Sequence, residues 1–209
     1  MNIETVRTIA DRYPWASWAV WDDAFPEDGC IESDPERLVK FVSGNVDDLT
    51  SDIVLMGLNR SDDLPAPFAN FHTPSRKHFD YRLKEAIQDG GLNRLQGAYM
   101  TDLVDEVDPD SNNIAVSDDD ATTLVEQLEL LDASEYHVVC FGNKPFDGLS
   151  QYFSADVTTM PPEMKTATVD ITGTTIHLYR VWFYGLYGSL QDKVNTFRQQ
   201  LRILDEELG

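Results

Sequence analysis

The stretch Asp52-Ile53-Val54-Leu55-Met56-Gly57 sets four apolar side chains in a row between an acidic residue and a glycine. A short apolar run without alternation is typical of a strand in a parallel sheet, where both faces are buried. The chain then turns polar at Leu58-Asn59-Arg60-Ser61, and three prolines follow by Pro74. We therefore predict a buried parallel strand that leads into a long loop, and long loops in compact domains tend to carry function.

Further segments of this kind follow along the chain. Strand patterns fall at 97–104, 136–141, 166–171 and 175–183, with helical patterns between most of them. Strands that alternate with helices indicate an α/β domain with a mostly parallel sheet. Residues 1–50 show helical spacing instead, and neither an internal repeat nor a linker divides the chain. We expect a single domain, residues 1–209, with residues 1–50 as a helical extension packed on it.

The net charge is strongly negative. The 209 residues include 37 Asp and Glu against 16 Lys and Arg, which gives −21, while 42% of the residues are apolar. The apolar share predicts a folded core. The charge argues against a general nucleic-acid coat protein, because neutralising phosphates requires clustered Lys and Arg. A local basic groove is still compatible with it. Solubility is the simplest explanation of the acidity, and adaptation to high internal salt is an alternative.

Cysteine usage and hydropathy suggest a compartment. Cys30 and Cys140 lie far apart, so we predict a reduced, cytoplasmic protein without a disulfide framework or a zinc motif. No apolar stretch approaches the roughly 20 residues that span a bilayer, so we expect no membrane partner. Nothing in the sequence demands an oligomer, and we expect a monomer. The runs Asp22-Asp23 and Asp118-Asp119-Asp120 mark caps or solvated loops more often than cation sites. We therefore predict neither a metal nor a cofactor.

Four polar turns follow the predicted strands. They are Leu58-Asn59-Arg60-Ser61, Thr101-Asp102, Gly142-Asn143 and Phe183-Tyr184-Gly185. Ligands of open α/β sheets bind outside the carboxyl ends of the strands, so these turns should converge on one crevice. Asn59 is the most suggestive residue, because a carboxamide can hold a water molecule or a substrate edge through its donor and acceptor groups. A plain turn-forming role for Asn59 is about equally compatible with the sequence.

A basic island follows the first of these turns. From Leu64 to Lys84, four basic residues face a single acid, Asp80. Because the island coincides with the long loop, we expect it to face an anionic ligand, although a solvated helix face is the alternative. Trp15, Trp18 and Trp21 lie at intervals of three. We interpret that stripe as core rather than as a stacking platform for bases.

The order of these features resembles the uracil-DNA glycosylase superfamily. The resemblance covers roughly residues 52–190 and is nearest to the mismatch-specific branch and its uncharacterised bacterial relatives, whose first motif runs Gly-x-Asn-Pro-Gly. It is carried by short motifs at strand ends: Gly57-Leu58-Asn59, the loop aromatics Phe68 and Phe71, Gly97-Ala98-Tyr99-Met100-Thr101-Asp102, and Val138-Val139-Cys140-Phe141-Gly142-Asn143.

The resemblance implies a three-layer α/β/α sandwich with a four-stranded, mostly parallel central sheet. It implies hydrolysis of the N-glycosidic bond of a damaged or mismatched base, flipped out of DNA, without metal or cofactor. Asn59 would orient the attacking water. The implied base-binding residues are Phe68, Phe71, Thr101, Asp102 and Asn143, and the implied phosphate contacts are Arg60, Arg76 and Lys77.

Two departures from the family pattern bear on activity. Arg60 and Ser61 stand where the nearest motif has Pro-Gly, and the second motif, usually His followed by Pro or a small residue and Ser, falls at Phe183-Tyr184-Gly185. Phe183 donates no hydrogen bond and Gly185 has no hydroxyl. We therefore expect the fold to be retained and the glycosylase activity to be weak, altered or absent. The alternatives are a non-catalytic nucleobase-binding, nucleotide-binding or protein-interaction member of the same fold, or an acidic mimic of DNA.

Overall fold

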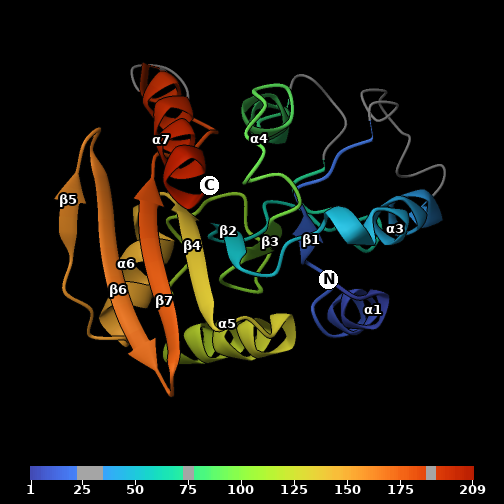
Figure 1. The fold of residues 1–209 in the computed structure, drawn as a ribbon, viewed down its shortest axis with the longest axis horizontal. Helices are drawn as coiled ribbons and strands as arrows, with labels where there is room; N and C mark the ends of the chain where they lie inside the picture. The colour runs from blue at the N-terminus through green and yellow to red at the C-terminus, as the bar shows by residue number, and fades with distance from the viewer. Residues whose placement is uncertain (23–34, 73–77, 187–191) are drawn as a thin grey trace.

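A mixed sheet of seven strands runs through the computed structural model, which describes residues 1–22, 35–72, 78–186 and 192–209 (Figure 1). The strand order is β1-β3-β2-β4-β7-β6-β5. The neighbours β3, β2, β4 and β7 are parallel, whereas β1 at one edge and β6 and β5 at the other are antiparallel. The strands are β1 (Ser17–Trp18), β2 (Ile53–Gly57), β3 (Tyr99–Asp102), β4 (Glu135–Phe141), β5 (Thr158–Met160), β6 (Met164–Ile171) and β7 (Thr174–Val181).

The predicted α/β class is confirmed, but the sheet is larger and more mixed than the four-stranded, mostly parallel sheet that we expected. Two of the additional strands are very short: β1 has two residues and β5 has three. Such segments are too short to show the period-two pattern by which strands are read from sequence. β6 forms a hairpin with β7, as the two adjacent strand patterns indicated.

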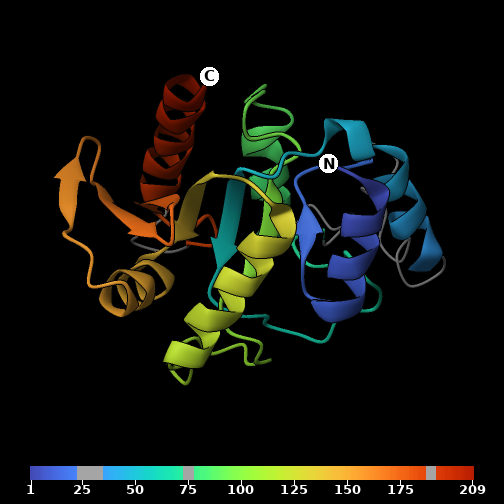
Figure 2. The same cartoon turned by 60° about the horizontal axis from the view of Figure 1, so that its bottom comes forward.

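Helices cover both faces of the sheet (Figures 1 and 2). On one face α1, α5 and α6 share a core cluster, and on the other α4 and α7 share a second. The alternation of β4 explains both clusters, because Val138 and Cys140 belong to the first and Val139 and Phe141 to the second. The helices are α1 (Ile3–Arg12), α3 (Pro35–Gly44), the short η1 (Val46–Asp48), α4 (Asp80–Ile87), α5 (Asp118–Leu131), α6 (Asn143–Tyr152) and α7 (Asp192–Leu208).

The strand predicted from residues 52–57 is confirmed as β2, and all five of its residues are buried. Its side chains divide between the two core clusters, which is why the sequence shows no alternation there. Trp15, Trp18 and Trp21 are also buried, so their interpretation as core is confirmed. Residues 1–50 are less purely helical than expected, because β1 lies among them and pairs with β3.

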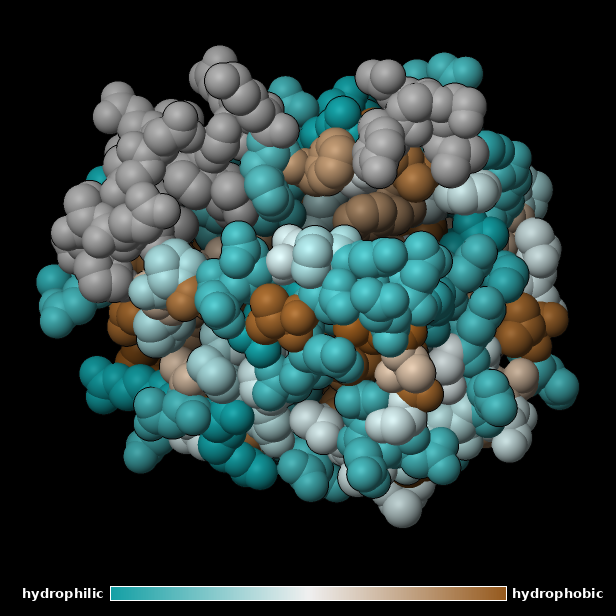
Figure 3. Space-filling model, turned by 180° about the vertical axis from the view of Figure 1, so that it is seen from behind, coloured by the Kyte–Doolittle hydropathy of each residue, from teal (hydrophilic) through white to brown (hydrophobic). Residues whose placement is uncertain are grey.

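The surface is mostly hydrophilic on the face shown in Figure 3, and the apolar residues there lie in scattered groups. None of the helices in the described part of the chain combines the length and the apolar character needed to cross a membrane. Cys140 is buried in β4, and its burial raises the pKa of the thiol well above the ordinary value. Cys30 lies outside the described residues.

Candidate functional site

The ends of β2 and β3 meet at Gly57 and Asp102. These residues are register partners in the parallel pair, and each is the last residue of its strand. A β-carbon placed on Gly57 would overlap Oδ1 of Asp102 and would lie 3.3 Å from Cε1 of Phe71. Glycine is therefore required where the carboxyl folds across the end of β2. We call Gly57, Asn70, Phe71 and Asp102 the strand-end cluster.

Asp102 is buried without a cationic hydrogen-bond partner among the described residues. It is 3% exposed, and its Oδ2 accepts a hydrogen bond from Nδ2 of Asn70 at 2.8 Å. Burial raises the pKa of Asp102 to about 7, the Asn70 hydrogen bond opposes this, and the nearby charge of Asp80 raises it further while Arg60 lowers it. A carboxyl that titrates near neutrality at a strand end is suited to acid–base chemistry.

Thr101 and Asp102, both among the base-binding residues that the resemblance implies, point to opposite faces of the sheet. Thr101 is fully buried, and its Oγ1 donates to Oε1 of Gln127 in α5 at 2.9 Å. Its hydroxyl therefore serves the packing of α5 on β3. Only Asp102 of the pair reaches the strand-end cluster, because successive side chains of a strand alternate between faces.

The two loop aromatics also separate. Phe71 lies against Gly57 and belongs to the core cluster of α4 and α7, whereas Phe68 packs edge-on against Trp18 at 5.5 Å in the other cluster. Both have positive φ angles, of 65° at Phe68 and 63° at Phe71. Ser17 Oγ donates to the Phe68 carbonyl, and Trp21 Nε1 donates to the Phe71 carbonyl. These bonds hold an uncommon backbone conformation, of a kind that clusters at functional sites.

Asn59 and Arg60 are engaged with the neighbouring loop. Nδ2 of Asn59 donates to the carbonyls of Arg60 and Asp108, both at 2.8 Å. Arg60 is ion-paired with Asp105, and its guanidinium lies over Trp15 at 5.9 Å. These bonds are those of a turn-forming Asn59, and the Arg60 guanidinium already has an anionic partner. The water-orienting role of Asn59 and the phosphate contact of Arg60 stay predictions.

The second-motif segment places one aromatic at the surface and one in the core. Phe183 is 38% exposed, and its Cβ would lie 4.0 Å from a β-carbon on Gly142, the residue before α6. A β-carbon on Gly185 would overlap the Phe183 ring, so the ring covers that glycine. Asn143, the first residue of α6, is exposed. The end of β7 therefore lies beside the junction of β4 and α6, as the convergence of strand ends requires.

Tyr184 supplies the hydroxyl that its neighbours lack. It is buried, packs edge-on against Phe141 at 5.2 Å, and donates from Oη to Oδ1 of Asp80 at 3.2 Å. Burial, followed by the charges of Asp80 and Asp102, raises the pKa of Tyr184 well above its ordinary value, so the phenol stays protonated. Tyr184 therefore brings a neutral donor into the neighbourhood of Asp102.

Helix α4 holds this segment in place. Nη1 of Arg82 donates to the carbonyls of Tyr184 at 3.1 Å and Leu186 at 2.9 Å. Asp80 and Arg82 entered the prediction only as charges of the basic island, and their contacts with Tyr184 and Leu186 span more than one hundred residues, so no local signal revealed these contacts. The other predicted phosphate contacts, Arg76 and Lys77, lie outside the described residues.

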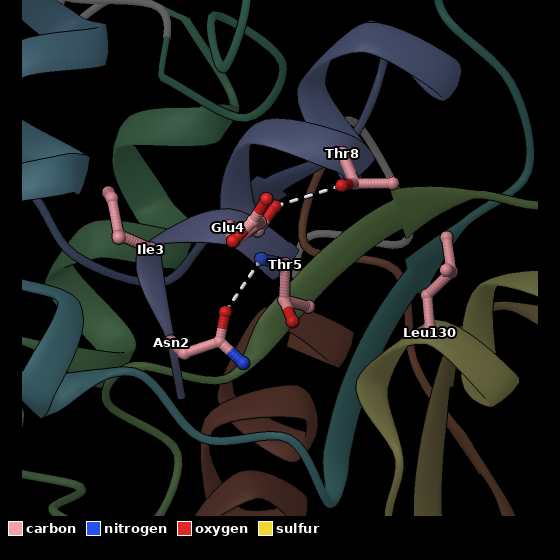
Figure 4. A pocket seen from close by; sticks show the side chains of 6 residues that line it. All are labelled: Asn2, Ile3, Glu4, Thr5, Thr8 and Leu130. Atoms are coloured by element: carbon pink, nitrogen blue, oxygen red, sulfur yellow. Dashed lines mark hydrogen bonds between the residues drawn. The ribbon is translucent and has the colours of Figure 1, made fainter.

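A separate hollow of about 430 Å³ lies between the start of α1 and the end of α5 (Figure 4). Leu130, which lines the hollow, lies shortly before the start of β4. The hollow is therefore at the amino ends of the strands, opposite to Asp102 at the carboxyl end of β3. The hydrogen bonds drawn there, Thr5 N to Asn2 Oδ1 and Thr8 Oγ1 to the Glu4 carbonyl, are the local bonds of α1. Its polar groups serve the helix, and we do not take it as the functional site.

Within residues 1–22, 35–72, 78–186 and 192–209, no three His, Cys, Asp or Glu side chains are placed to hold a metal ion. The run Asp118-Asp119-Asp120 opens α5, where Ser117 and Asp120 form a reciprocal capping box. Its interpretation as a helix cap is therefore confirmed.

No family model matches the chain, and no curated protein matches it either. The function is therefore inferred from the geometry of the strand-end cluster.

Proposed function

We propose that the chain is a uracil-DNA glycosylase-like protein that hydrolyses the N-glycosidic bond of a damaged or mismatched base in DNA. The crevice would lie at the carboxyl ends of β2, β3, β4 and β7, the four adjacent parallel strands. The observation that carries the proposal is the buried carboxyl of Asp102, folded across Gly57 and accompanied by Phe71. Helices on both faces of the sheet agree with the three-layer fold that the resemblance implies.

Hydrolysis of this bond requires control of one proton on each side of the sugar. The oxygen of water bonds to C1′ and loses a proton, the C1′–N bond breaks, and the departing base keeps the electron pair and takes up a proton, so the products are the free base and a sugar with a hydroxyl at C1′. With a pKa of about 7, raised by burial, Asp102 is protonated in a large fraction of molecules at neutral pH. In that form it donates a hydrogen bond or a proton to the leaving base, which a permanently ionised carboxylate could not do.

The surrounding groups are Phe71 and Asn70. The ring of Phe71 lies beside Gly57 and is 5% exposed, so stacking on a base would require the loop that carries it to move. Asn70 fixes Oδ2 of Asp102 and is itself oriented, because its Nδ2 also donates to the Trp15 carbonyl at 2.8 Å. Such pre-oriented groups lose little freedom when the substrate arrives.

An incision assay tests the proposal. Oligonucleotides that contain uracil, hypoxanthine or a mismatched base would be incubated with the protein, treated with alkali and resolved by length. We expect strand breaks at the modified position and a loss on the order of 100-fold or more in Asp102→Asn, as for removal of a general acid. Asp170→Asn is the matched control, because Asp170 is exposed at the far end of β6. Absence of product above background with every substrate would overturn the enzymatic proposal.

A non-catalytic nucleobase- or nucleotide-binding role is the second candidate. It is favoured by the amide of Asn59, which is already bonded to backbone carbonyls, and by Phe183, which has no donor to offer. Thermal melting with a panel of free bases and nucleotides separates the two, because a ligand that binds only the folded state raises the melting temperature. Stabilisation without incision would favour the binding role.

A further inference from the structure

Arg180 is a buried cation with unused hydrogen-bond donors. It is 8% exposed, and its Nε and Nη1 are both shielded from solvent without a hydrogen-bond partner among the described residues. Burial lowers the pKa of Arg180, but a guanidinium stays protonated at neutral pH, so the positive charge remains. Burying a charged group without partners for its donors is unfavourable, and an acceptor that binds these nitrogens would remove that penalty.

The side chain of Arg180 lies near the carboxyl end of β7, on the face of the sheet that α6 covers. The register partners of Arg180 are Cys140 in β4 and Lys165 in β6. Leu178, two residues earlier in β7, belongs with Cys140 to the core cluster that includes α6. Alternate residues of a strand point to the same face, so Arg180 points there as well. Its guanidinium carbon lies 5.0 Å from the centre of the Trp182 ring, just beyond the end of β7.

The surroundings of Arg180 carry an excess of positive charge. Lys165 pairs with Asp147 of α6 at 2.9 Å, and Lys193 of α7 pairs with Glu163 at 2.8 Å. Asp147 and Glu163 are the two carboxylates whose charges act on Arg180, and each already has a lysine. Among the described residues, Arg180 therefore adds a third cation to two carboxylates, in a chain whose net charge is −21.

Trp182 orients the guanidinium and lies between it and the second lysine. The ammonium of Lys193 is 4.8 Å from the centre of the Trp182 ring, and Nε1 of Trp182 donates to Oε2 of Glu163 at 3.1 Å. These contacts fix the ring against which Arg180 lies. Trp182, Lys165 and Lys193 are all partly exposed, so a small anion reaches the guanidinium from this side without crossing the core.

We propose that Arg180 is the centre of an anion-binding site whose ligand is a phosphate group. A phosphate offers several acceptor oxygens for Nε and Nη1 and neutralises the excess positive charge. A guanidinium is more weakly hydrated than an ammonium and is well suited to phosphate, so it is the cation expected at a buried site of this kind. Phe183, which borders the proposed crevice, follows Trp182 directly. The phosphate therefore belongs to a free nucleotide or to DNA, and its binding does not require the proposed hydrolysis.

A titration with inorganic phosphate tests the site. The Nε–H groups of the arginines are observed by 1H–15N NMR, and the Arg180 signal is assigned by its loss in Arg180→Lys. Phosphate is compared with chloride at equal ionic strength. We expect a saturable shift of the Arg180 signal with phosphate and none with chloride, because only phosphate offers several acceptor oxygens. An equal response to both ions, or no shift with phosphate, would overturn the site.

Arg180→Met removes the charge and the donors and keeps an unbranched side chain. We expect phosphate to raise the melting temperature of the parent protein, and we expect the phosphate affinity to fall about tenfold or more in the variant. Arg198→Met is the matched control, because Arg198 is a more exposed arginine that pairs with Glu85 at 3.3 Å. We expect its response to phosphate to match that of the parent. Equal phosphate affinity in Arg180→Met and the parent would overturn the proposal. The titration of the parent protein decides the question if Arg180→Met folds poorly.

Two further ligands distinguish the sources of the phosphate. Deoxyuridine monophosphate and a single-stranded oligonucleotide without uracil are titrated in the same way. Tighter binding of the mononucleotide at the Arg180 signal would assign the site to a free nucleotide, and tighter binding of the oligonucleotide would assign it to the DNA backbone. A phosphate response without incision would overturn only the proposed glycosylase, and incision without an Arg180 response would overturn only this inference.

Discussion

Asp102 and Gly57 end two adjacent parallel strands as register partners, and the absence of a side chain on Gly57 is what allows the Asp102 carboxyl to fold across the end of β2. The carboxyl is thereby removed from water and held by Asn70. This one contact links the β2 strand that decides the fold to the chemistry of the proposed site.

Gly57→Ala tests that contact. The added methyl group would overlap Oδ1 of Asp102 and press on Phe71, so we expect a loss of about 1–3 kcal/mol in the free energy of unfolding, the range for overpacking a well-packed interior. Urea denaturation measures it. Gly44→Ala is the matched control, because nothing lies within 4 Å of a β-carbon there and its φ, like that of Gly57, is not left-handed. A loss at Gly57 no larger than the loss at Gly44 would contradict the overlap with Asp102.

Asp102→Asn is expected to stabilise the protein at alkaline pH. Burial raises the pKa of Asp102 to about 7 in the folded state. The contribution of Asp102 to the free energy of unfolding is therefore fully present below the pKa of this residue in the unfolded chain, and it is lost as pH rises through its pKa in the folded protein. The difference between the ordinary pKa of 3.8 and the folded pKa of about 7 corresponds to about 4 kcal/mol at most. We expect the variant to exceed the parent protein by up to that amount at pH 8 and to match it near pH 4, in urea denaturation at both pH values. A variant no more stable at pH 8 would contradict the burial of an ionisable carboxyl.

His72 predicts the opposite dependence on pH. It is buried, its Nε2 lies 3.1 Å from the Trp18 carbonyl, and burial lowers its pKa to about 4. Because the folded pKa is depressed, stability is present above the unfolded pKa, near 6.5, and is lost as pH falls towards 4. We expect about 3 kcal/mol of stability to disappear over that window through this residue. His72→Gln should flatten the acid limb of the stability curve, and an unchanged acid limb would exclude His72 as its cause.

Asn59→Asp separates a structural role from a chemical one. The substitution removes the Nδ2 donor and places a carboxylate against the carbonyls of Arg60 and Asp108. We expect the free energy of unfolding to fall by about 1–3 kcal/mol, the usual cost of leaving partly buried polar groups unpaired. Urea denaturation would be read beside the incision assay. Lost incision with unchanged stability would favour the water-orienting role and contradict the structural one.

The parts of the fold that could be predicted from sequence are those whose signal is local. The apolar run of β2 and the three prolines after it lie within one short stretch. The structure has the strand where it was expected, and the loop through residue 72, where the described residues pause. β1 and β5 were missed because two or three residues show no period. The convergence of strand ends followed from the parallel order rather than from any single residue.

The site was harder to predict because its contacts join distant segments. Tyr184 and Asp80 are separated by more than one hundred residues, and neither lies in a sequence motif from which their contact could be predicted. The ionisation of Asp102 depends on its burial and on the hydrogen bond from Asn70, and that bond forms only when the loop folds back on β3. At Asn59 the sequence left two roles open, and the bonds of its Nδ2 to the carbonyls of Arg60 and Asp108 could not be read from the sequence.

The most direct test of the central claim compares incision of a uracil-containing oligonucleotide by the parent protein and by Asp102→Asn over a range of pH. We predict measurable incision by the parent protein, a decline as pH rises through about 7 because burial sets the pKa of Asp102 there, and a loss on the order of 100-fold or more in the variant. Incision by Asp102→Asn at the rate of the parent protein would contradict the assignment of Asp102 as the reacting group.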